Sequence, residues 1–224
     1  MASGQNRICE VYDRLLDAFG PQGWWPAETP FETMVGAILT QNTAWVNVER
    51  AIGSLKGAGA LDARILLEMP DDRLETLIRP AGTFRVKTRR LKAFLAYFVC
   101  KYGADVSRMT DVPPGRLRDE LLSVNGIGPE TADCILLYAL DKTSFVVDGY
   151  TRRIFGRLGV IDRSLKYPEV KRRFEVALPE DVGVYNEYHA LIVALGKHAC
   201  LPTPRCGRCV LKTICETGGT NGQV

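Results

Sequence analysis

The chain has 224 residues, of which 46% are hydrophobic and 25% charged, and its formal net charge is +3. This length and composition suffice for a buried core in one domain or two small lobes, so we expect an ordinary globular protein. No apolar run approaches the roughly 20 residues that span a bilayer, and the first residues lack the pattern of a signal peptide, so a cytoplasmic location is expected.

Apolar residues recur at helical spacing through most of the chain, and proline or glycine separates the periodic segments. In 6–19, for example, Ile8, Val11, Leu15 and Phe19 would share one helix face. Similar patterns predict helices over 46–55, 86–101, 116–122, 129–140 and 185–199. A strand-like run at 144–147 is too short to build a sheet. The sequence therefore predicts an all-α protein.

Basic residues are unevenly distributed, although the net charge is too small to indicate nucleic-acid binding by itself. The windows 79–92 and 197–212 contain no acidic residue. Their basic residues are Arg79, Arg85, Lys87, Arg89, Arg90 and Lys92 in the first window and Lys197, Arg205, Arg208 and Lys212 in the second. Both windows are candidate phosphate-facing patches. A solvated helix face is the alternative for the first.

A tight turn is predicted at Asn125-Gly-Ile-Gly128. Its two glycines permit positive φ angles and leave their peptide N–H groups open to a close ligand. Pro129 then begins a helix at its favoured first position. Unpaired N–H groups and the positive end of the dipole at such a helix start suit a phosphodiester oxygen. The turn therefore predicts a sequence-blind DNA clamp, with a plain glycine-rich connector as the alternative.

The surrounding motif, Leu-x-x-x-x-Gly-Ile-Gly-x-x-Thr-Ala and then Val146-Val-Asp148, resembles that of the helix-hairpin-helix DNA glycosylases related to endonuclease III. The resemblance extends over nearly the whole chain. It implies a six-helix lobe over 23–141 that carries the hairpin, and a second helical lobe formed by 1–22 and 142–224. It also implies binding to double-stranded DNA that contains a damaged base. The chain contains no heptad or self-pairing segment, so we expect a monomer. The DNA-binding residues implied in the hairpin are Asn125, Gly126, Ile127, Gly128 and Thr131.

Asp148 takes the position of the carboxylate that supports cleavage of the base-to-sugar bond in that family. It is also suited to cap a helix over 151–158, and the two roles are compatible. In relatives that also cut the strand, a lysine two residues after the second glycine forms a Schiff base with the sugar. That position is Glu130 here, and a carboxylate cannot form an imine. We therefore expect a monofunctional glycosylase, with Lys142 and Lys197 as alternative amines. Glu130 would either face solvent in its helix's first turn or assist water activation.

Four of the seven cysteines share one short segment, with the spacing Cys200-x5-Cys206-x2-Cys209-x5-Cys215. Such density in a cytosolic chain indicates metal ligation rather than disulfides. Zinc would accept four thiolates. Endonuclease III and its relatives, however, carry a [4Fe–4S] cluster on a similar loop, usually one residue longer between the first two ligands. The resemblance implies a structural cluster on 200–215, and the loop would then present Arg205, Arg208 and Lys212 to DNA. We expect the remaining cysteines to be buried: Cys9, Cys100 and Cys134.

Other motifs resemble those of bacterial 3-methyladenine glycosylases within the endonuclease III superfamily. The matching segments are Trp24-Trp-Pro26, Gly36-Ala-Ile-Leu-Thr-Gln-Asn-Thr43, and Arg79-Pro-Ala-Gly82 ahead of Lys87. In that subfamily two tandem tryptophans and an aromatic residue sandwich the base, which implies a pocket formed here by Trp24, Trp25, Pro26 and Trp45. Lys197 matches a lysine near that pocket that can carry a carbamyl group. The subfamily lacks the four-cysteine loop, so the chain combines features of two branches.

The tryptophans have two interpretations. Core anchors are one, because tryptophan is commonly buried. The other is a flat slot for a flipped base, since indole faces stack on bases and attract cations. A purine methylated on a ring nitrogen is positively charged and already a good leaving group, so this slot would favour alkylated purines over neutral oxidised pyrimidines.

Gln41 is expected to fill the gap left by the flipped nucleotide, as the equivalent glutamine does in relatives. A helix-capping or surface amide is the alternative. In the predicted reaction the hairpin grips the backbone, the tryptophans hold the base, and Asp148 stabilises the oxocarbenium-like sugar or orients water. Two other hypotheses stay open: a bifunctional pyrimidine glycosylase with abasic lyase activity, and a non-catalytic module that recognises distorted duplex.

Overall fold

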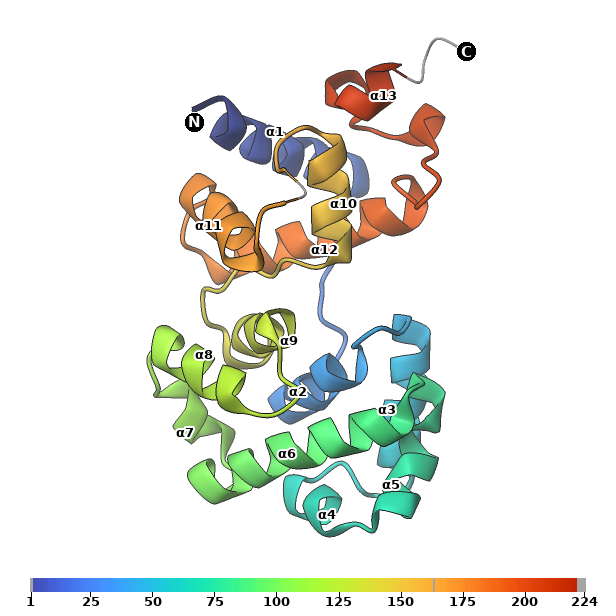
Figure 1. The fold of residues 1–224 in the computed structure, drawn as a ribbon, viewed down its shortest axis with the longest axis vertical. Helices are drawn as coiled ribbons and strands as arrows, with labels where there is room; N and C mark the ends of the chain where they lie inside the picture. Colours follow the sequence, from blue (N-terminus) through green and yellow to red (C-terminus); the bar gives the residue numbers. More distant parts are fainter. Residues whose placement is uncertain (1, 163, 221–224) are drawn as a thin grey trace. The chain divides into compact units, whose positions relative to one another are not determined.

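The computed structural model describes residues 2–162 and 164–220, and every regular element in this part of the chain is helical (Figure 1). The chain divides into two compact units. One unit comprises Met1–Trp24 and Thr143–Val224, and the other comprises Trp25–Lys142. No helix in the described part of the chain combines the length and the apolar character that a membrane crossing requires.

The unit Trp25–Lys142 is formed by short helices around one long one. Its elements are α2 (Pro30–Leu39), α3 (Trp45–Gly57), α4 (Ala63–Glu68), α5 (Asp71–Ile78), η1 (Arg79–Ala81), α6 (Phe84–Tyr102), α7 (Val106–Thr110), α8 (Pro114–Ser123), α9 (Pro129–Cys134) and η2 (Ile135–Ala139). Proline stands in the first turn of α2, α8 and α9, where a backbone N–H has no helical partner. Thr29, Asp62 and Asp105 cap α2, α4 and α7 through their side-chain oxygens.

Helix α2 is the centre of this unit. Residues 32–39 are all buried, because α3, α6 and α9 surround the helix. Phe31 at its start stacks on Phe98 of α6 with ring centroids 6.0 Å apart, and Phe98 stacks in turn on Phe94. A helix that is buried on every side is one that its neighbours enclose. The packing therefore fixes the end of α2, from which the segment with Gln41 leaves.

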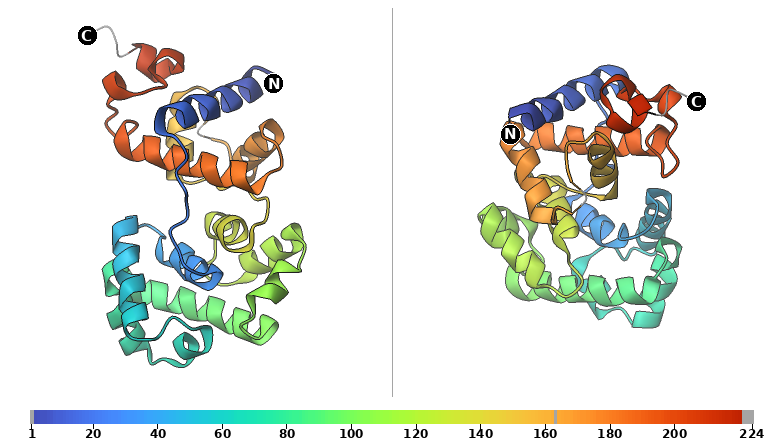
Figure 2. Two further views of the ribbon diagram at one scale, coloured as in Figure 1. Left: turned by 180° about the vertical axis from the view of Figure 1, so that it is seen from behind. Right: turned by 45° about the horizontal axis from the view of Figure 1, so that its top comes forward.

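The other unit brings together both ends of the chain. It contains α1 (Ala2–Phe19), α10 (Gly149–Arg157), α11 (Tyr167–Ala177), α12 (Val182–His198), η3 (Cys206–Arg208), η4 (Lys212–Ile214) and α13 (Glu216–Thr220). Helix α1 packs on α11 and α12 (Figures 1 and 2). The Tyr188 hydroxyl of α12 donates to the Ile8 carbonyl at 2.7 Å, and Phe145 stacks on Phe174 with centroids 4.4 Å apart. These contacts bury the segment that leads to Asp148.

The six helices predicted from apolar spacing are confirmed, with their ends moved by up to four residues, and the helix expected over 151–158 is α10. The helix predicted over 129–140 changes character after Cys134 and continues as a π-helical turn, Ile135–Ala139. Residues 144–147 form a buried loop rather than a strand. Several short helices were not predicted from the sequence, among them α4, α5 and α7. Each is too short to reveal a helical period.

Candidate functional site

The hairpin before α9 has the backbone geometry that its glycines predict. Gly126 has a φ angle of +87°, and the Ile127 amide closes the turn by donating to the Val124 carbonyl at 3.1 Å. Gly128 is the N-cap of α9, with Pro129 at the first helical position. Within the described residues, the N–H groups of Gly126 and Gly128 have no hydrogen-bond partner in the protein. They are therefore available to an anionic ligand.

Gln41 contacts this hairpin directly. Its amide nitrogen donates to the Gly126 carbonyl at 3.0 Å and to the Thr131 hydroxyl at 2.9 Å. Its amide oxygen accepts a hydrogen bond from Arg90 at 2.5 Å. The sequence does not predict this arrangement, since the three segments lie far apart along the chain. In this structure both ends of the Gln41 amide are occupied by the protein's own groups.

Glu130 lies exposed in the first turn of α9. A carboxylate at this point is stabilised by the positive end of the helix dipole. In the neighbouring hairpin, Asn125 is exposed and Gly128 is half-buried, whereas Ile127 is buried and anchors the turn.

Trp25 and Trp45 line one cavity in the unit Trp25–Lys142. Their rings meet edge to face, with centroids 4.8 Å apart and planes at 83°. Trp25 also contacts Tyr138, at 4.9 Å between centroids. Both indoles approach Gly36, where a Cβ atom would lie 3.6 Å from Trp45 and 3.7 Å from Trp25. Because the two indoles are in contact, the space between their rings is closed.

Two carboxylates share this cavity with the indoles. Its lining consists of Trp25, Pro26, Ala27, Glu32, Gly36, Trp45, Glu49, Ile52, Gly53 and Lys56. The Trp45 indole N–H donates to Glu49 at 2.8 Å. Buried Glu32 pairs with Lys56 at 2.9 Å, and Lys56 also reaches Glu28 at 2.9 Å. Hydrogen bonds to Glu32 and Glu28 raise the pKa of Lys56. Since Lys56 offsets one carboxylate, the lining as a whole carries a negative charge.

Trp24 belongs to the other unit, where it contacts Lys197. The Lys197 ammonium lies 5.4 Å from the centroid of the Trp24 ring, within cation–π range. Lys197 is exposed near the end of α12. The structure thus brings together Trp25 with Trp45 and, separately, Trp24 with Lys197.

Asp148 is buried and caps α10. Its Oδ1 atom accepts hydrogen bonds from the Thr151 amide at 2.7 Å and the Thr151 hydroxyl at 2.8 Å. Its Oδ2 atom faces His189 Nε2 at 3.6 Å, longer than a normal hydrogen bond. Burial opposes ionisation, but His189 and Thr151 outweigh it and lower the pKa of the Asp148 carboxyl. The carboxylate is therefore held in its ionised form, and the capping role predicted from the sequence is confirmed.

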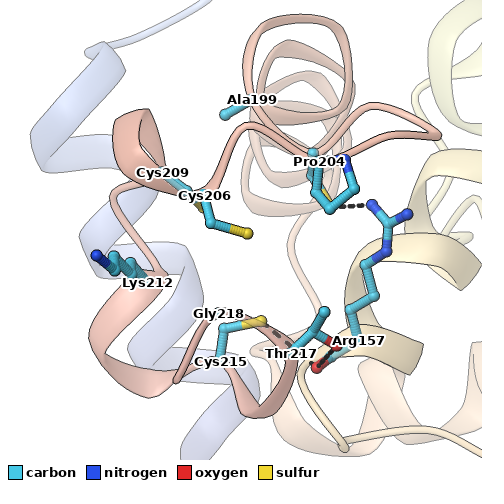
Figure 3. Close-up of a pocket in the computed structure, with 10 residues that line it drawn as sticks. Arg157, Ala199, Pro204, Cys206, Cys209, Lys212, Cys215, Thr217 and Gly218 are labelled. Atoms are coloured by element: carbon cyan, nitrogen blue, oxygen red, sulfur yellow. Dashed lines mark hydrogen bonds between the residues drawn. The ribbon is translucent and has the colours of Figure 1, made fainter. Parts of the chain in front are cut away.

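The four clustered cysteines line a single cavity. Figure 3 shows the thiol of Cys206 directed into it, with Arg157 on the opposite wall. The Arg157 guanidinium donates to Cys200 Sγ at 3.2 Å and to the Leu201 carbonyl at 2.6 Å, and the Arg157 carbonyl accepts from the Cys215 thiol at 3.4 Å. Among the described residues, no three His, Cys, Asp or Glu side chains converge on a point where one metal ion could sit. The thiols instead surround a shared space.

The remaining cysteines differ from one another. Cys134 is buried, as predicted, while Cys9 is half-buried and donates its thiol to the Ala177 carbonyl at 3.2 Å. Cys100 is exposed, so the prediction that it is buried was wrong. Position 100 falls on the outer side of α6, away from Phe94 and Phe98, which face the core.

The two arginines of the cysteine loop are exposed. Arg205 and Arg208, with Gly207, line a shallow hollow at the surface. The sequence predicts that they face DNA, and this stays a prediction. Sequence reasoning missed several residues that the structure brings to the sites described above: Glu49, Tyr138, Arg157 and His189. Arg90 was expected in a phosphate-facing patch, whereas the structure places it against Gln41.

An all-helical chain with a glycine hairpin, an aromatic cavity and a buried carboxylate at a helix start has the features of a DNA repair glycosylase. The sequence profile of the HhH-GPD superfamily base excision DNA repair proteins matches residues 35–180. A protein of Methanocaldococcus jannaschii is 52% identical to this chain over 209 residues, which cover 93% of this chain and 95% of the relative. That relative is named as a provisionally assigned DNA repair glycosylase. The chain therefore belongs to the HhH-GPD superfamily and is an endonuclease III-like base excision repair DNA glycosylase.

Solved structures share the fold. An endonuclease III in a non-covalent complex with DNA superimposes with a TM-score of 0.85 at 22% identity, covering 98% of this chain and 99% of that one. The H. pylori 3-methyladenine DNA glycosylase MagIII bound to 1,N6-ethenoadenine gives a TM-score of 0.74 at 26% identity, covering 87% and 97%. The predicted all-α endonuclease III-like fold is thereby confirmed.

Proposed function

We propose that this glycosylase removes N-alkylated purines, such as 3-methyladenine, from double-stranded DNA and leaves the abasic strand uncut. The observation that carries the proposal is the cavity in which Trp25 and Trp45 lie beside the carboxylates of Glu32 and Glu49. Indole faces and nearby negative charge both attract a flat cation. A purine methylated on a ring nitrogen is such a cation, whereas an oxidised pyrimidine is neutral.

Asp148 is the proposed catalytic carboxylate. As the base departs, positive charge develops on the sugar, and an ionised carboxylate close to it stabilises that charge or orients the attacking water. The low pKa of Asp148 supports this role, because the group stays charged without a cation from the substrate. Thr151 holds one oxygen of the carboxylate in place, and His189 faces the other.

The amines of this chain favour hydrolysis without strand cleavage. Glu130 occupies the position at which the resemblance implies a lysine in lyases, so no imine can form there. Lys142 donates to the Thr110 carbonyl at 2.7 Å, and Lys197 rests near the Trp24 ring. Both alternative amines thus have partners within the protein. Glu130 is a less favoured candidate for activating water, since it is exposed in its helix's first turn.

The cysteine loop fits a [4Fe–4S] cluster held by Cys200, Cys206, Cys209 and Cys215. Four thiols around one cavity match the donor set of such a cluster, and the Arg157 guanidinium would offset part of the thiolate charge. When bound, the cluster would cross-link a loop that has little core of its own. The loop would then present Arg205 and Arg208 to DNA phosphates.

The hairpin is the proposed backbone clamp. The free N–H groups of Gly126 and Gly128 suit a phosphate oxygen, with Asn125, Ile127 and Thr131 shaping the turn around them. Pro26 lines the cavity proposed to hold the base, while Trp24 and Lys197 stay predicted pocket residues. We propose that one monomer performs the reaction.

The test uses methylated duplex DNA and purified protein. Released bases are identified by mass spectrometry, and the duplex is run on a gel without alkali. Release of 3-methyladenine with intact strands is the expected result. Cleaved strands, or a covalent complex trapped by borohydride, would establish the bifunctional alternative. Binding to distorted duplex without release of any base, on alkylated and oxidised substrates alike, would establish the non-catalytic one.

A further inference from the structure

Helix α6 reaches the hairpin through a chain of hydrogen bonds. Arg90 donates to the amide oxygen of Gln41, and the amide nitrogen of Gln41 donates to the Gly126 carbonyl and the Thr131 hydroxyl. We name these bonds the Arg90–Gln41 strap. The bond to Thr131 fixes the first turn of α9, and the bond to Gly126 fixes the turn before it. The strap therefore holds both halves of the motif at once.

The bond to the Gly126 carbonyl holds the Gly126–Ile127 peptide, which sets the shape of the turn. Gly126 has φ +87°, and the peptide that carries its carbonyl also carries the Ile127 amide, which closes the turn on Val124. Arg90 adds packing, because a Cβ atom at Gly126 would overlap Arg90 Cγ. The aliphatic stem of Arg90 thus lies against the glycine while its guanidinium holds Gln41.

The strap has a firm base. Lys87, one turn earlier on α6, is buried and donates to the Leu39 carbonyl at 2.7 Å and the Ala81 carbonyl at 2.6 Å. Leu39 is the last residue of α2, so the backbone that leads to Gln41 is itself held. Gln41 is therefore fixed by its main chain and by both ends of its side chain.

We propose that Arg90 is a positioning residue for DNA binding, which acts through Gln41 to hold the hairpin with the N–H groups of Gly126 and Gly128 presented to a phosphate. A turn held in this way does not have to be ordered when DNA binds, and that raises affinity. Gln41 then contributes to DNA binding before any nucleotide is flipped, whereas the sequence predicts that it inserts into the base stack. This inference rests on the proposed DNA-binding role of the hairpin.

The experiment compares Arg90→Met, Gln41→Leu and the control Arg89→Met in the full-length protein. Methionine at position 90 keeps the packing stem and removes the donor. Arg89 is the exposed neighbour, so its replacement removes the same charge without touching the strap. Hydrogen exchange of the segment 122–131 is measured without DNA. Affinity is measured on an undamaged duplex and on one with an abasic-site analogue.

We expect exchange at Ile127 to accelerate in Arg90→Met and Gln41→Leu but not in Arg89→Met. Both strap variants should lose about tenfold in affinity, equally on the two duplexes and beyond the loss in the control. If Gln41→Leu weakens only the abasic duplex and exchange is unchanged, Gln41 acts as a wedge and the inference is overturned. Faster exchange with unchanged affinity would overturn the DNA-binding role of the strap while leaving the proposed base excision intact.

Discussion

Asp148 combines a structural role with the proposed chemical one, and a single substitution separates them. Asparagine caps helices as well as aspartate does, so Asp148→Asn removes the charge and keeps the bond to the Thr151 amide. We expect single-turnover excision from methylated duplex to fall by about 10²–10³-fold, the loss typical of removing a preorganised electrostatic contact. Thermal stability and affinity for the duplex should change little.

A matched control is available at the start of α12. Asp181 caps that helix by accepting from the Val184 amide at 2.8 Å, but it is exposed. Asp181→Asn therefore makes the same chemical change at a second N-cap and should leave excision unchanged. Equal losses in the two variants would assign the effect of Asp148→Asn to helix capping rather than to catalysis.

Glu49 is the residue expected to tune the preference for charged bases. Glu49→Gln can still accept the bond from the Trp45 indole but loses the negative charge. We expect kcat/KM to fall by about fivefold for cationic 3-methyladenine and to stay unchanged for the neutral 1,N6-ethenoadenine, because an exposed charge contributes up to about 1 kcal/mol. Glu68→Gln, exposed on α4 and outside the cavity lining, is the control. Parallel losses on both bases would show that Glu49 only supports Trp45.

Residues whose partners are local in sequence were the predictable ones. The bond from Thr151 to Asp148 spans three positions, so the N-cap could be predicted from the sequence. Glu49 lies four positions after Trp45, and this helical spacing could have revealed it. His189 and Arg90 meet their partners only through tertiary folding. Nothing in the local pattern marks His189, and the basic window that contains Arg90 does not reveal Gln41 as its partner. Cys100 is a wrong prediction of the opposite kind. Its apolar neighbours in the sequence predicted burial, but the residue lies on the outer side of α6 and is exposed.

At the scale of elements, Glu120 joins α8 to α6. Its carboxylate accepts from the Tyr97 hydroxyl at 3.0 Å and the Tyr102 hydroxyl at 2.5 Å, and it pairs with Lys101 at 2.7 Å. Burial opposes its ionisation, but these partners prevail and lower the pKa of Glu120 to about 2 from 4.5. A folded-state pKa below the unfolded value means that this stabilisation is complete above pH 4.5 and is lost as the pH falls through about 2.

We predict that the free energies of unfolding of the unaltered protein and of Glu120→Gln differ by an amount that depends on pH. The free energy of unfolding should be lower in Glu120→Gln by a constant amount above about pH 5, and the difference should shrink steadily between about pH 4.5 and 2. Urea unfolding across this range measures it. A difference that stays constant down to pH 2 would show that the Glu120 carboxylate contributes through its shape and hydrogen bonds rather than its charge.

The long helices were predictable because their apolar period repeats over several turns, as in α6 and α12. Helix α2 was not, because its sequence is apolar without interruption from Met34 to Leu39 and gives no clear period. The π-helical turn after α9 was also beyond sequence reasoning. Its residues continue the helical pattern, and packing against α2 accompanies the change.

At the scale of the whole molecule, the contacts that link the ends of the chain have no signature in any local pattern. Arg7 of α1 donates to the Ile214 carbonyl at 2.6 Å, and the Tyr188 hydroxyl reaches the Ile8 carbonyl. Such pairs arise only when one unit assembles from both ends. The resemblance to a known family could imply this arrangement, whereas composition and periodicity could not.

Charge is the property of the whole molecule that bears most directly on DNA binding. A net charge of +3 gives little general attraction for a duplex, so local patches become important, and we propose that Arg205 and Arg208 form one of them. Removing one cationic side chain from a DNA phosphate reduces the slope of log K against log salt by about 0.9. We therefore expect Arg208→Gln to weaken binding at low salt and to reduce the slope by about that amount.

The control for this prediction is Arg73→Gln. Arg73 is exposed on α5 and lies outside both basic windows, so its replacement should leave the slope unchanged. If the two variants alter the slope equally, attraction is spread over the surface and the cysteine loop has no special part in it. If Arg208→Gln weakens binding without changing the slope, Arg208 supports the loop rather than a phosphate.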